Sequence, residues 1–339
     1  MKEQKKILWL RPTTGDNVSI RRERIIEHLE KREFEVTLQN ASGRDSLTAT
    51  IEAIRGDYDI IVGNVRLGLY LGYLLSVLLR IPFVGDVSDP IHQIDHLPSP
   101  LYRILEWYEW FVISRADMVV FVYQSSYQEA LEKGIVDPVR LPNAVDHERF
   151  ADPDNDVVKQ ARDILRENNI DPESQIAIYT GSMVSRYHLA EIGDASEQLP
   201  EWEFVFIGEE RGAEIHSIVA GRANTHFLGA FDYELIPGFL AHSNLGLCLV
   251  DAEQPLKLKE FTAAGLPTLV IPSMQQWYDY DNLIFIDPTP RSIVSAVNSL
   301  DGLSVSDRHI DIKENELENW EDISQQYHQI FNQLYDRSG

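Results

Sequence analysis

The stretch that decides the fold is Pro255-Leu-Lys-Leu-Lys-Glu-Phe-Thr-Ala-Ala-Gly-Leu-Pro-Thr-Leu-Val-Ile271. Pro255 suits the first turn of a helix, where a missing N–H costs nothing, and Gly265 suits the left-handed position after the last turn. Pro267 then begins an apolar run that predicts a buried strand. The free amides and the positive dipole end of such a helix form an anion site that suits a phosphate or a pyrophosphate.

Two charged side chains lie near the start of this helix. Lys257 falls in its first turn, and Glu260 follows about one turn in, where a carboxylate could hydrogen-bond sugar hydroxyls just beyond a phosphate. This combination predicts a nucleotide-sugar site. The alternative is purely structural, because capped helices followed by strands occur throughout α/β proteins and the dipole alone favours a Glu near a helix N-terminus.

Length and composition predict a globular protein of two domains with an acidic surface. The chain has 339 residues, of which 44% are hydrophobic and 10% aromatic, and its formal net charge is -24. So acidic a surface argues against nucleic acid as a partner. Only nine of the 30 basic residues are Lys. Excess carboxylate with few Lys predicts a halophilic protein adapted to molar salt, and an acidic protein from an ordinary cytoplasm is the alternative.

Cysteine usage and hydropathy predict a cytoplasmic location. Cys248 is the only cysteine and lies in an apolar run, so it cannot form an intrachain disulfide and is interpreted as a core residue. No signal-peptide-like segment follows Met1. The apolar stretch Leu67–Leu79 is shorter than the roughly 20 residues of a membrane span, so it predicts a buried helix. The alternative is peripheral docking of this stretch, with Trp107 and Trp110, at a membrane.

Apolar runs of strand length alternate with amphipathic helical segments from end to end. The runs begin at Lys6, Asp59, Ile81 and Met118 in the first half and at Gln175, Phe204, Thr225 and Ser243 in the second. This alternation is typical of parallel sheets covered by helices. It predicts two doubly wound, Rossmann-like α/β domains, in which ligands bind at the carboxyl ends of the strands.

Two polar loops of the first half follow predicted strands. One contains Thr14 and Gly15, and the other contains Asp89 and His92. Both loops are candidates to bind the acceptor, because ligands bind at the carboxyl ends of the strands in such sheets. Carboxylates and imidazoles serve as general bases, so Asp89 and His92 are candidates to position an acceptor hydroxyl or to take up its proton. Asp before Pro is also common turn chemistry, which is the structural alternative.

Three stretches carry a resemblance to a known family. The string Pro-Leu-Lys-Leu-x-Glu-Phe-x-Ala-Ala-Gly-x-Pro at 255–267 resembles the donor-site signature of the two-domain GT-B fold glycosyltransferases of glycosyltransferase family four. Pro-Asn-Ala-Val-Asp-His-Glu-Arg-Phe at 142–150 is similar to the segment that ends the first domain in this family, and 316–335 is similar to its C-terminal helix. The resemblance implies an acceptor domain at 1–150, a nucleotide-sugar domain at 151–315 that faces it across a cleft, and a helix at 316–339 that crosses back to the first domain.

The resemblance also implies a donor site. Gly181, Ser182 and Arg186 match the phosphate loop of the family, although Arg186 follows the Gly at a spacing one residue shorter than expected. Gly229 and Phe231 match the segment that reads the nucleotide base.

In the opening stretch, Lys257 and the helix amides at Leu256 and Leu258 would hold the diphosphate, and Glu260 would hold the ribose. Many relatives have a further Glu where this chain has Ala252, and the neighbouring Asp251 or Glu253 is a candidate to replace it.

The implied activity is a retaining glycosyl transfer that needs no bound metal. The donor would be a nucleotide-sugar carrying a hexose-type sugar, and the acceptor a glycan or a lipid-linked glycan. The implied role is surface glycan or polysaccharide biosynthesis in the cytoplasm or at the inner face of the cell membrane. Two alternatives are a sugar-nucleotide 2-epimerase, which shares this architecture, and a catalytically degenerate scaffold that binds nucleotide-sugars.

Overall fold

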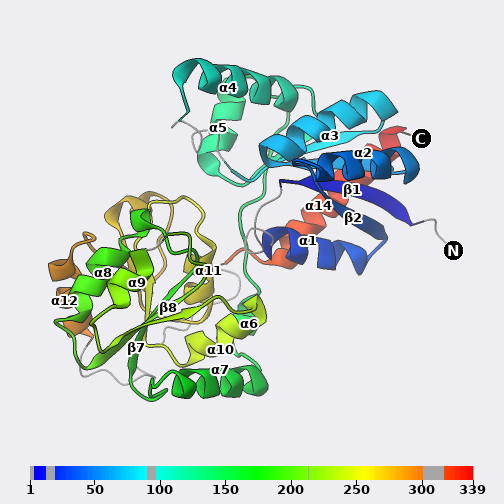
Figure 1. Ribbon diagram of the computed structural model, residues 1–339. Helices are drawn as coiled ribbons and strands as arrows, with labels where there is room; N and C mark the ends of the chain where they lie inside the picture. Colours follow the sequence, from blue (N-terminus) through cyan, green and yellow to red (C-terminus); the bar gives the residue numbers. More distant parts are fainter. Residues whose placement is uncertain (1–3, 13–19, 90–96, 213, 301–316, 339) are drawn as a thin grey trace. The chain divides into compact units, whose positions relative to one another are not determined.

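The chain forms two compact units, shown in the computed structural model of Figure 1, which describes residues 4–12, 20–89, 97–212, 214–300 and 317–338. Unit 1 comprises residues 1–143 and 320–339, and unit 2 comprises residues 144–319. The predicted boundary after residue 150 lies within helix α6 (His147–Ala151), whose Phe150 is buried in the core of unit 2.

Unit 1 is built on a six-stranded parallel sheet. Its order is β2 (Phe34–Asn40), β1 (Lys5–Arg11), β3 (Ile60–Asn64), β4 (Phe83–Val87), β5 (Met118–Phe121) and β6 (Val139–Arg140). The central strands β3 and β4 are buried along their whole length, as expected for a parallel sheet covered on both faces.

The helices of unit 1 cover this sheet. They are α1 (Ile20–Glu30), α2 (Asp45–Arg55), α3 (Val65–Leu79), α4 (Ser99–Ile113), α5 (Gln124–Glu132) and α14 (Trp320–Ser338). Helices α1 and α14 pack against each other, while α3 contacts α2 and also α4 (Figure 1). Right-handed crossovers account for this arrangement, because the chain reverses direction across the sheet after β2.

Helix α3 packs on the sheet through its small residues. A Cβ on Gly68 would lie 2.5 Å from the Leu10 carbonyl oxygen, and a Cβ on Gly72 would lie 2.7 Å from the Phe83 ring. These glycines therefore allow the helix to lie directly on the strands. Leu69 and Leu75 are buried on the same face, but the prediction of a buried helix at 67–79 is wrong for the opposite face, where Leu74 and Leu78 are 61% and 65% exposed.

Helix α14 belongs to unit 1 although it follows unit 2 in the sequence. It places Tyr327 and Phe331 against Trp9 of β1, with ring centroids 5.5 and 6.4 Å apart respectively. Phe331 also lies edge-on to Phe34 of β2. All four aromatic side chains are fully buried, so α14 completes the core on this face of the sheet.

Unit 2 repeats the same architecture. Its sheet is parallel, in the order β12 (Leu283–Phe285), β11 (Thr268–Val270), β10 (Leu245–Cys248), β7 (Gln175–Thr180), β8 (Trp202–Ile207) and β9 (Thr225–Gly229). The helices are α6, α7 (Asn155–Glu167), α8 (Leu189–Ser196), α9 (Glu214–Val219), α10 (Ile236–Ala241), α11 (Leu256–Ala263) and α12 (Pro290–Ser299), with single turns η3 (Ser185–Tyr187), η4 (Tyr233–Leu235) and η5 (Pro272–Gln276). Two doubly wound parallel sheets confirm the predicted fold class.

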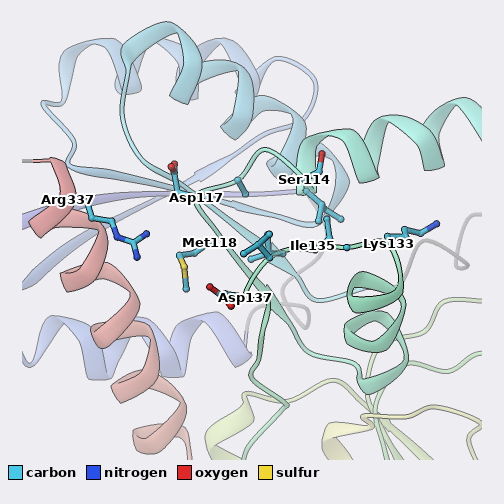
Figure 2. A pocket seen from close by; sticks show the side chains of 12 residues that line it. Ser114, Asp117, Met118, Lys133, Ile135, Asp137 and Arg337 are labelled. Atoms are coloured by element: carbon cyan, nitrogen blue, oxygen red, sulfur yellow. The ribbon is translucent and has the colours of Figure 1, made fainter.

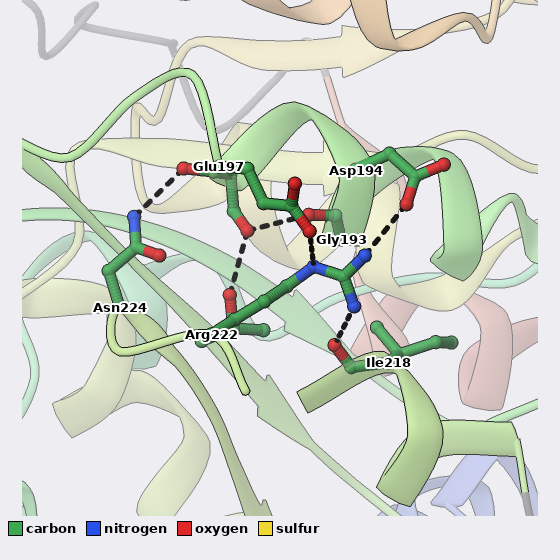
Figure 3. Close-up of polar contacts among 8 residues, drawn as sticks. Gly193, Asp194, Glu197, Ile218, Arg222 and Asn224 are labelled. Carbon is green, nitrogen blue, oxygen red and sulfur yellow. Dashed lines mark hydrogen bonds and ion pairs between the residues drawn. The ribbon is translucent and has the colours of Figure 1, made fainter. Parts of the chain in front are cut away.

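The amino edge of the second sheet is closed by a polar network, shown in Figure 3. The Asn224 side-chain amide donates to the carbonyls of Ser196, Leu199 and Trp202 at 2.9–3.0 Å, which ties the end of α8 to the start of β8. The Arg222 guanidinium pairs with Asp194 at 2.7 Å and with Glu197 at 2.9 Å. These groups satisfy one another and hold the edge together.

Candidate functional site

The carboxyl edge of the second sheet has a topological switch point between β7 and β10. The chain runs outward from β7 to β8 and β9 on one side, and β10 lies on the other side of β7. The loops that leave β7 and β10 therefore diverge, and the crevice between such loops is where doubly wound sheets bind ligands. The predicted phosphate loop follows β7, and the Pro255–Ile271 stretch follows β10.

Helix α11 begins at Leu256 after Pro255, and Gly265 follows its last turn with a φ of +67°. The Leu266 amide bonds back to the Phe261 carbonyl at 2.9 Å, which caps the C-terminus as the Gly predicts. At the other end, the Leu258 amide donates to the Pro255 carbonyl at 3.1 Å. The first-turn amides left to face an anion are therefore those of Leu256 and Lys257.

Lys257 has a buried ammonium group that no described residue hydrogen-bonds. Its Nζ lies 3.7 Å from the centroid of the Tyr179 ring and 5.2 Å from that of Tyr187. A Cβ on Gly181 would come within 2.9 Å of the same Nζ, so the ammonium lies directly beside the loop after β7. Burial lowers the pKa of Lys257 to about 8, against the opposing effects of Cys248 and Glu260. The group is thus a cation held in an apolar and aromatic setting, with no carboxylate of the described residues in hydrogen-bond contact.

Glu260 lies on the same helix and is 4% exposed. Burial raises its pKa to about 7, while interaction with the Tyr233 side chain and the charge of Lys257 lower it. Lys257 and Glu260 therefore form a coupled pair in which burial disfavours both charges. Such opposed shifts in one crevice are typical of functional sites.

Arg186 lies on η3 and is exposed. Its Nη2 donates to the Tyr187 hydroxyl at 3.0 Å, and its guanidinium carbon lies 5.0 Å from the Tyr187 ring centroid. Tyr187 therefore contacts both Arg186 and Lys257, so the structure brings together the two basic residues that the sequence assigned to the diphosphate.

The glycines at this edge have conformations that other residues rarely adopt. Gly181 has a φ of +122° and Gly208 a φ of +148°, and a Cβ on Gly208 would meet the Gly181 carbonyl oxygen at 1.9 Å. Ser182 contributes its backbone carbonyl, which accepts from the Tyr179 hydroxyl at 2.9 Å. Gly229 has a φ of +80° and bonds through its carbonyl to the Gly208 amide at 2.8 Å. The backbones of three strand ends are thus packed tightly against one another, and Gly181 lies beside Lys257 of α11.

Phe231 and the loop before α11 hold the remaining predicted donor residues. The Phe231 ring is half-buried and lies 5.1 Å from Phe239. Glu253 is buried, and its carbonyl accepts from the Tyr278 hydroxyl at 2.7 Å. Asp251 is exposed and accepts from the Ser273 hydroxyl at 3.0 Å. Both candidates to replace the Glu absent at position 252 are therefore anchored in the loop that leads into α11.

In unit 1, only part of the predicted acceptor region falls within the described residues. Thr14, Gly15 and His92 lie outside them. Asp89 is half-buried just beyond β4. Burial lowers the pKa of Arg22, against the opposing charges of Asp86 and Asp89.

Next to Asp89, the carboxyl ends of β3 and β4 carry a buried network. Arg22 bonds to Asn64, and the Asn64 amide donates to Asp86 at 3.0 Å and to Ser88 at 3.0 Å. Asp86 belongs to β4 and is fully buried, whereas Asp89 beyond the strand is half-buried, so of these two carboxylates only Asp89 stays a candidate for the predicted acceptor site.

A pocket of about 280 Å³ lies elsewhere in unit 1, at the amino end of β5 (Figure 2). It is lined by the end of α4, the start of β5, the turn from Lys133 to Asp137 and Arg337 of α14. The carboxylate of Asp117, which lines the pocket, accepts a hydrogen bond from the Phe83 amide at 2.8 Å. The pocket contains none of the predicted site residues and lies at the edge of the sheet opposite to the one that binds ligands in this architecture.

Three tyrosines of the second unit were not predicted from the sequence. Tyr179 and Tyr187 surround the Lys257 ammonium, and Tyr233 interacts with Glu260. Tyr187 directly follows Arg186 in the sequence. An aromatic residue beside a predicted phosphate-binding Arg was the signal from which Tyr187 could have been predicted to belong to the site. The described part of the chain contains no group of three or more His, Cys, Asp or Glu side chains arranged to hold a metal ion.

Comparison with known proteins tests the architecture. No protein-family model and no curated protein matches the chain. Among solved structures, Anabaena HepE in complex with UDP and glucose aligns with 97% of this chain and 100% of its own, at a TM-score of 0.74 and 14% identity. Sucrose-phosphate synthase from Thermosynechococcus elongatus aligns with 98% of this chain and 100% of its own, at 0.74 and 15% identity. The chain has the GT-B fold.

Other similar structures include a protein assigned as a UDP-N-acetylglucosamine 2-epimerase in Listeria monocytogenes. It aligns with 96% of this chain and 95% of its own, at a TM-score of 0.62 and 13% identity. One GT-B architecture thus accompanies different activities at this level of identity, and the function has to be argued from the site.

Proposed function

We propose that the protein is a retaining glycosyltransferase that moves a hexose-type sugar from a nucleotide-sugar donor to a glycan or lipid-linked acceptor. The observation that carries this proposal is the Lys257 ammonium, buried beside Gly181 at the switch point of the second sheet without a hydrogen-bond partner among the described residues. A buried cation without an anion is costly, and a diphosphate is the ligand that would remove the cost. The complexes of similar GT-B structures with UDP support this class of ligand.

In the proposed mechanism, the residues around α11 stabilise charge on the leaving diphosphate. Lys257, the amides of Leu256 and Lys257, and the exposed Arg186 guanidinium would face the oxygens on which negative charge grows as the bond between the sugar and the diphosphate breaks. Glu260 would accept hydrogen bonds from the ribose, and Gly229 and Phe231 would border the base. Charge stabilisation would therefore come from protein groups without a bound metal.

The acceptor is assigned to unit 1, with Asp89 as the described candidate to orient its hydroxyl. We place the enzyme in the biosynthesis of surface glycans or polysaccharides in the cytoplasm, and we attribute its excess of carboxylates to a halophilic origin.

The test is thermal unfolding in molar KCl with UDP-, GDP-, ADP- and TDP-sugars. We expect one nucleotide class to raise the unfolding temperature of the wild type, because a ligand that binds only the folded state stabilises it. Glu260→Ala and Arg186→Ala should reduce this shift and the turnover, whereas Glu167→Ala, an exposed change on α7, should preserve both. Unchanged shift and turnover in both site variants would contradict the proposal.

A second candidate function is a sugar-nucleotide 2-epimerase, which the similarity to the Listeria structure favours. The two reactions differ in their need for an acceptor. Conversion of a nucleotide-sugar to its epimer in the absence of any acceptor would favour the epimerase. Donor binding without turnover on any acceptor would instead indicate a degenerate scaffold, which Ala252 makes a further alternative.

A further inference from the structure

One face of unit 1 concentrates the exposed apolar side chains of the described chain. Of the twelve large apolar side chains exposed there, ten lie on the neighbouring helices α2, α3 and α4. They are Leu47, Ile51 and Ile54 on α2, Leu67, Leu74, Val77 and Leu78 on α3, and Leu101, Ile104 and Trp107 on α4. We call this set the α2–α4 surface. Single exposed apolar residues are normal, but a set this large on adjacent helices indicates an interaction site.

The spacing of these residues shows that the exposure follows a pattern. Leu47, Ile51 and Ile54 recur at four- and three-residue intervals, and Leu101, Ile104 and Trp107 recur at three-residue intervals, so each set lies on one helix face. On α3, Gly68 and Gly72 face the sheet together with the buried Leu69 and Leu75, whereas Leu67, Leu74, Val77 and Leu78 are exposed. Each helix therefore has an apolar outer face that the core does not require.

Charge on this part of the molecule differs from that of the rest. Residues 44–80 and 99–115 contain six Arg and six acidic residues, so their formal net charge is zero, although the whole chain carries -24. Most of the acidic side chains there are not exposed: Glu109 is buried, and Glu52, Asp59 and Glu106 are half-buried. The exposed charged side chains are mainly basic: Arg44, Arg55, Arg80, Arg103 and Arg115, against Asp45 and Asp57.

We propose that the α2–α4 surface docks on a bilayer that contains anionic lipids. Leucines and isoleucines would enter the boundary between headgroups and acyl chains, Trp107 would lie at the interface, and the Arg side chains would pair with lipid phosphates. Self-association through this surface is disfavoured, because it would bring the Arg side chains of two copies together. No helix in the described ranges is long and apolar enough to cross a membrane, so the contact would be peripheral.

Flotation of the full-length protein with lipid vesicles tests this proposal. We expect binding to vesicles of phosphatidylcholine mixed with phosphatidylglycerol, and weaker binding to phosphatidylcholine alone. The variant L74S/V77S/L78S should lower the partition coefficient at least about tenfold, because it removes three apolar side chains that would leave water. The matched control L131S/V136S changes the two exposed apolar residues that lie outside the α2–α4 surface, and it should bind like the wild type.

A second measurement locates the contact without depending on the stability of the triple variant. Trp107 is 66% exposed, whereas Trp9, Trp202 and Trp320 are buried, and Trp110 and Trp277 are half-buried. Brominated lipids should therefore quench the tryptophan fluorescence of the wild type, and W107F should remove most of this quenching. In ~2 M KCl the preference for anionic lipid should shrink while the effect of the triple variant persists, because screening weakens only the electrostatic part.

Three outcomes would overturn the proposal. In the first, no more wild-type protein floats with vesicles than without them. In the second, the triple variant binds vesicles as well as the wild type does. In the third, the wild type is a dimer and the triple variant is a monomer. The last result would assign the surface to a second copy of the chain. The thermal shift of the triple variant with nucleotide-sugars shows whether its donor site is intact. A result against membrane docking can thereby be told apart from a result against the proposed function.

Discussion

The two edges of the second sheet differ in how their polar groups are paired. At the amino edge, Asn224 and Arg222 bond to carbonyls and carboxylates of the protein itself. At the carboxyl edge, the Lys257 ammonium is buried without such a partner, and burial raises the pKa of Glu260. Paired polar groups stabilise a fold, whereas buried charges left unpaired reduce stability unless a ligand completes them. The comparison leads us to predict that one edge serves stability and the other serves binding.

The largest expected effect is on the carboxyl edge. Lys257→Met should weaken donor binding by about a hundredfold, or ~3 kcal/mol, because a desolvated cation facing a diphosphate is lost. Titration calorimetry with the nucleotide found in the thermal-shift panel measures this change. The exposed Lys159→Met on α7 removes the same charge away from the site and should bind normally. Equal losses in both variants would attribute the effect to net charge.

The same lysine predicts a pH dependence of binding. A diphosphate favours the charged ammonium, so binding requires a proton once the pH exceeds the free-state pKa of about 8. Donor affinity should therefore fall as the pH rises above about 8, by up to roughly tenfold per pH unit. In Lys257→Met this decline should disappear, and a persistent decline would assign the titration to another group.

At the amino edge, we expect a loss of stability with little effect on binding. Asn224→Ala removes the amide that satisfies three carbonyls, which should cost about 2–3 kcal/mol. Thermal unfolding of the free protein measures the cost, and donor affinity below the unfolding transition should stay within about twofold of the wild type. The exposed Asn298→Ala on α12 is the control. A large loss of affinity in Asn224→Ala would remove the distinction between the edges.

The smallest predicted effect is a gain in stability, whereas the preceding variants are expected to lose stability or affinity. The folded-state pKa of Glu260 lies above its ordinary value, so the folded state holds this proton more tightly, and stability falls as the pH rises from about 4.5 to about 7. Glu260→Gln should therefore stabilise the free protein by about 1–2 kcal/mol at pH 8 and weaken donor binding. At pH 4.5 the gain should be largely absent. Unfolding temperatures at both pH values decide the matter, and Glu167→Gln is the matched control.

Much of this architecture could be predicted from the sequence. The alternation of apolar runs predicted two parallel sheets, and Pro255 with Gly265 predicted the limits of α11. Periodicity could not show which face of an apolar helix is buried, so the stretch at 67–79 was predicted to be buried. The glycines of α3 were the overlooked signal, because small residues mark the face on which a helix approaches a sheet most closely.

The site was harder to predict than the fold. Lys257, Glu260 and Arg186 were predicted as site residues from their motifs and the resemblance, but their setting depends on contacts between segments far apart in the sequence. Tyr179 lies some 80 residues before Lys257, and only the pairing of β7 with β10 brings them together. The shifted pKa values likewise arise from burial, which depends on the complete fold.

The position of α14 has a consequence for the order in which the chain folds during synthesis. Trp9 and Phe34 are made before unit 2, yet the Tyr327 and Phe331 rings that cover them emerge only after the whole of unit 2 has left the ribosome. Unit 2, which is continuous in sequence, can fold while its neighbour still exposes an apolar sheet face. The nascent chain therefore carries an incomplete first domain for most of its translation, and that interval is when it would depend most on chaperones.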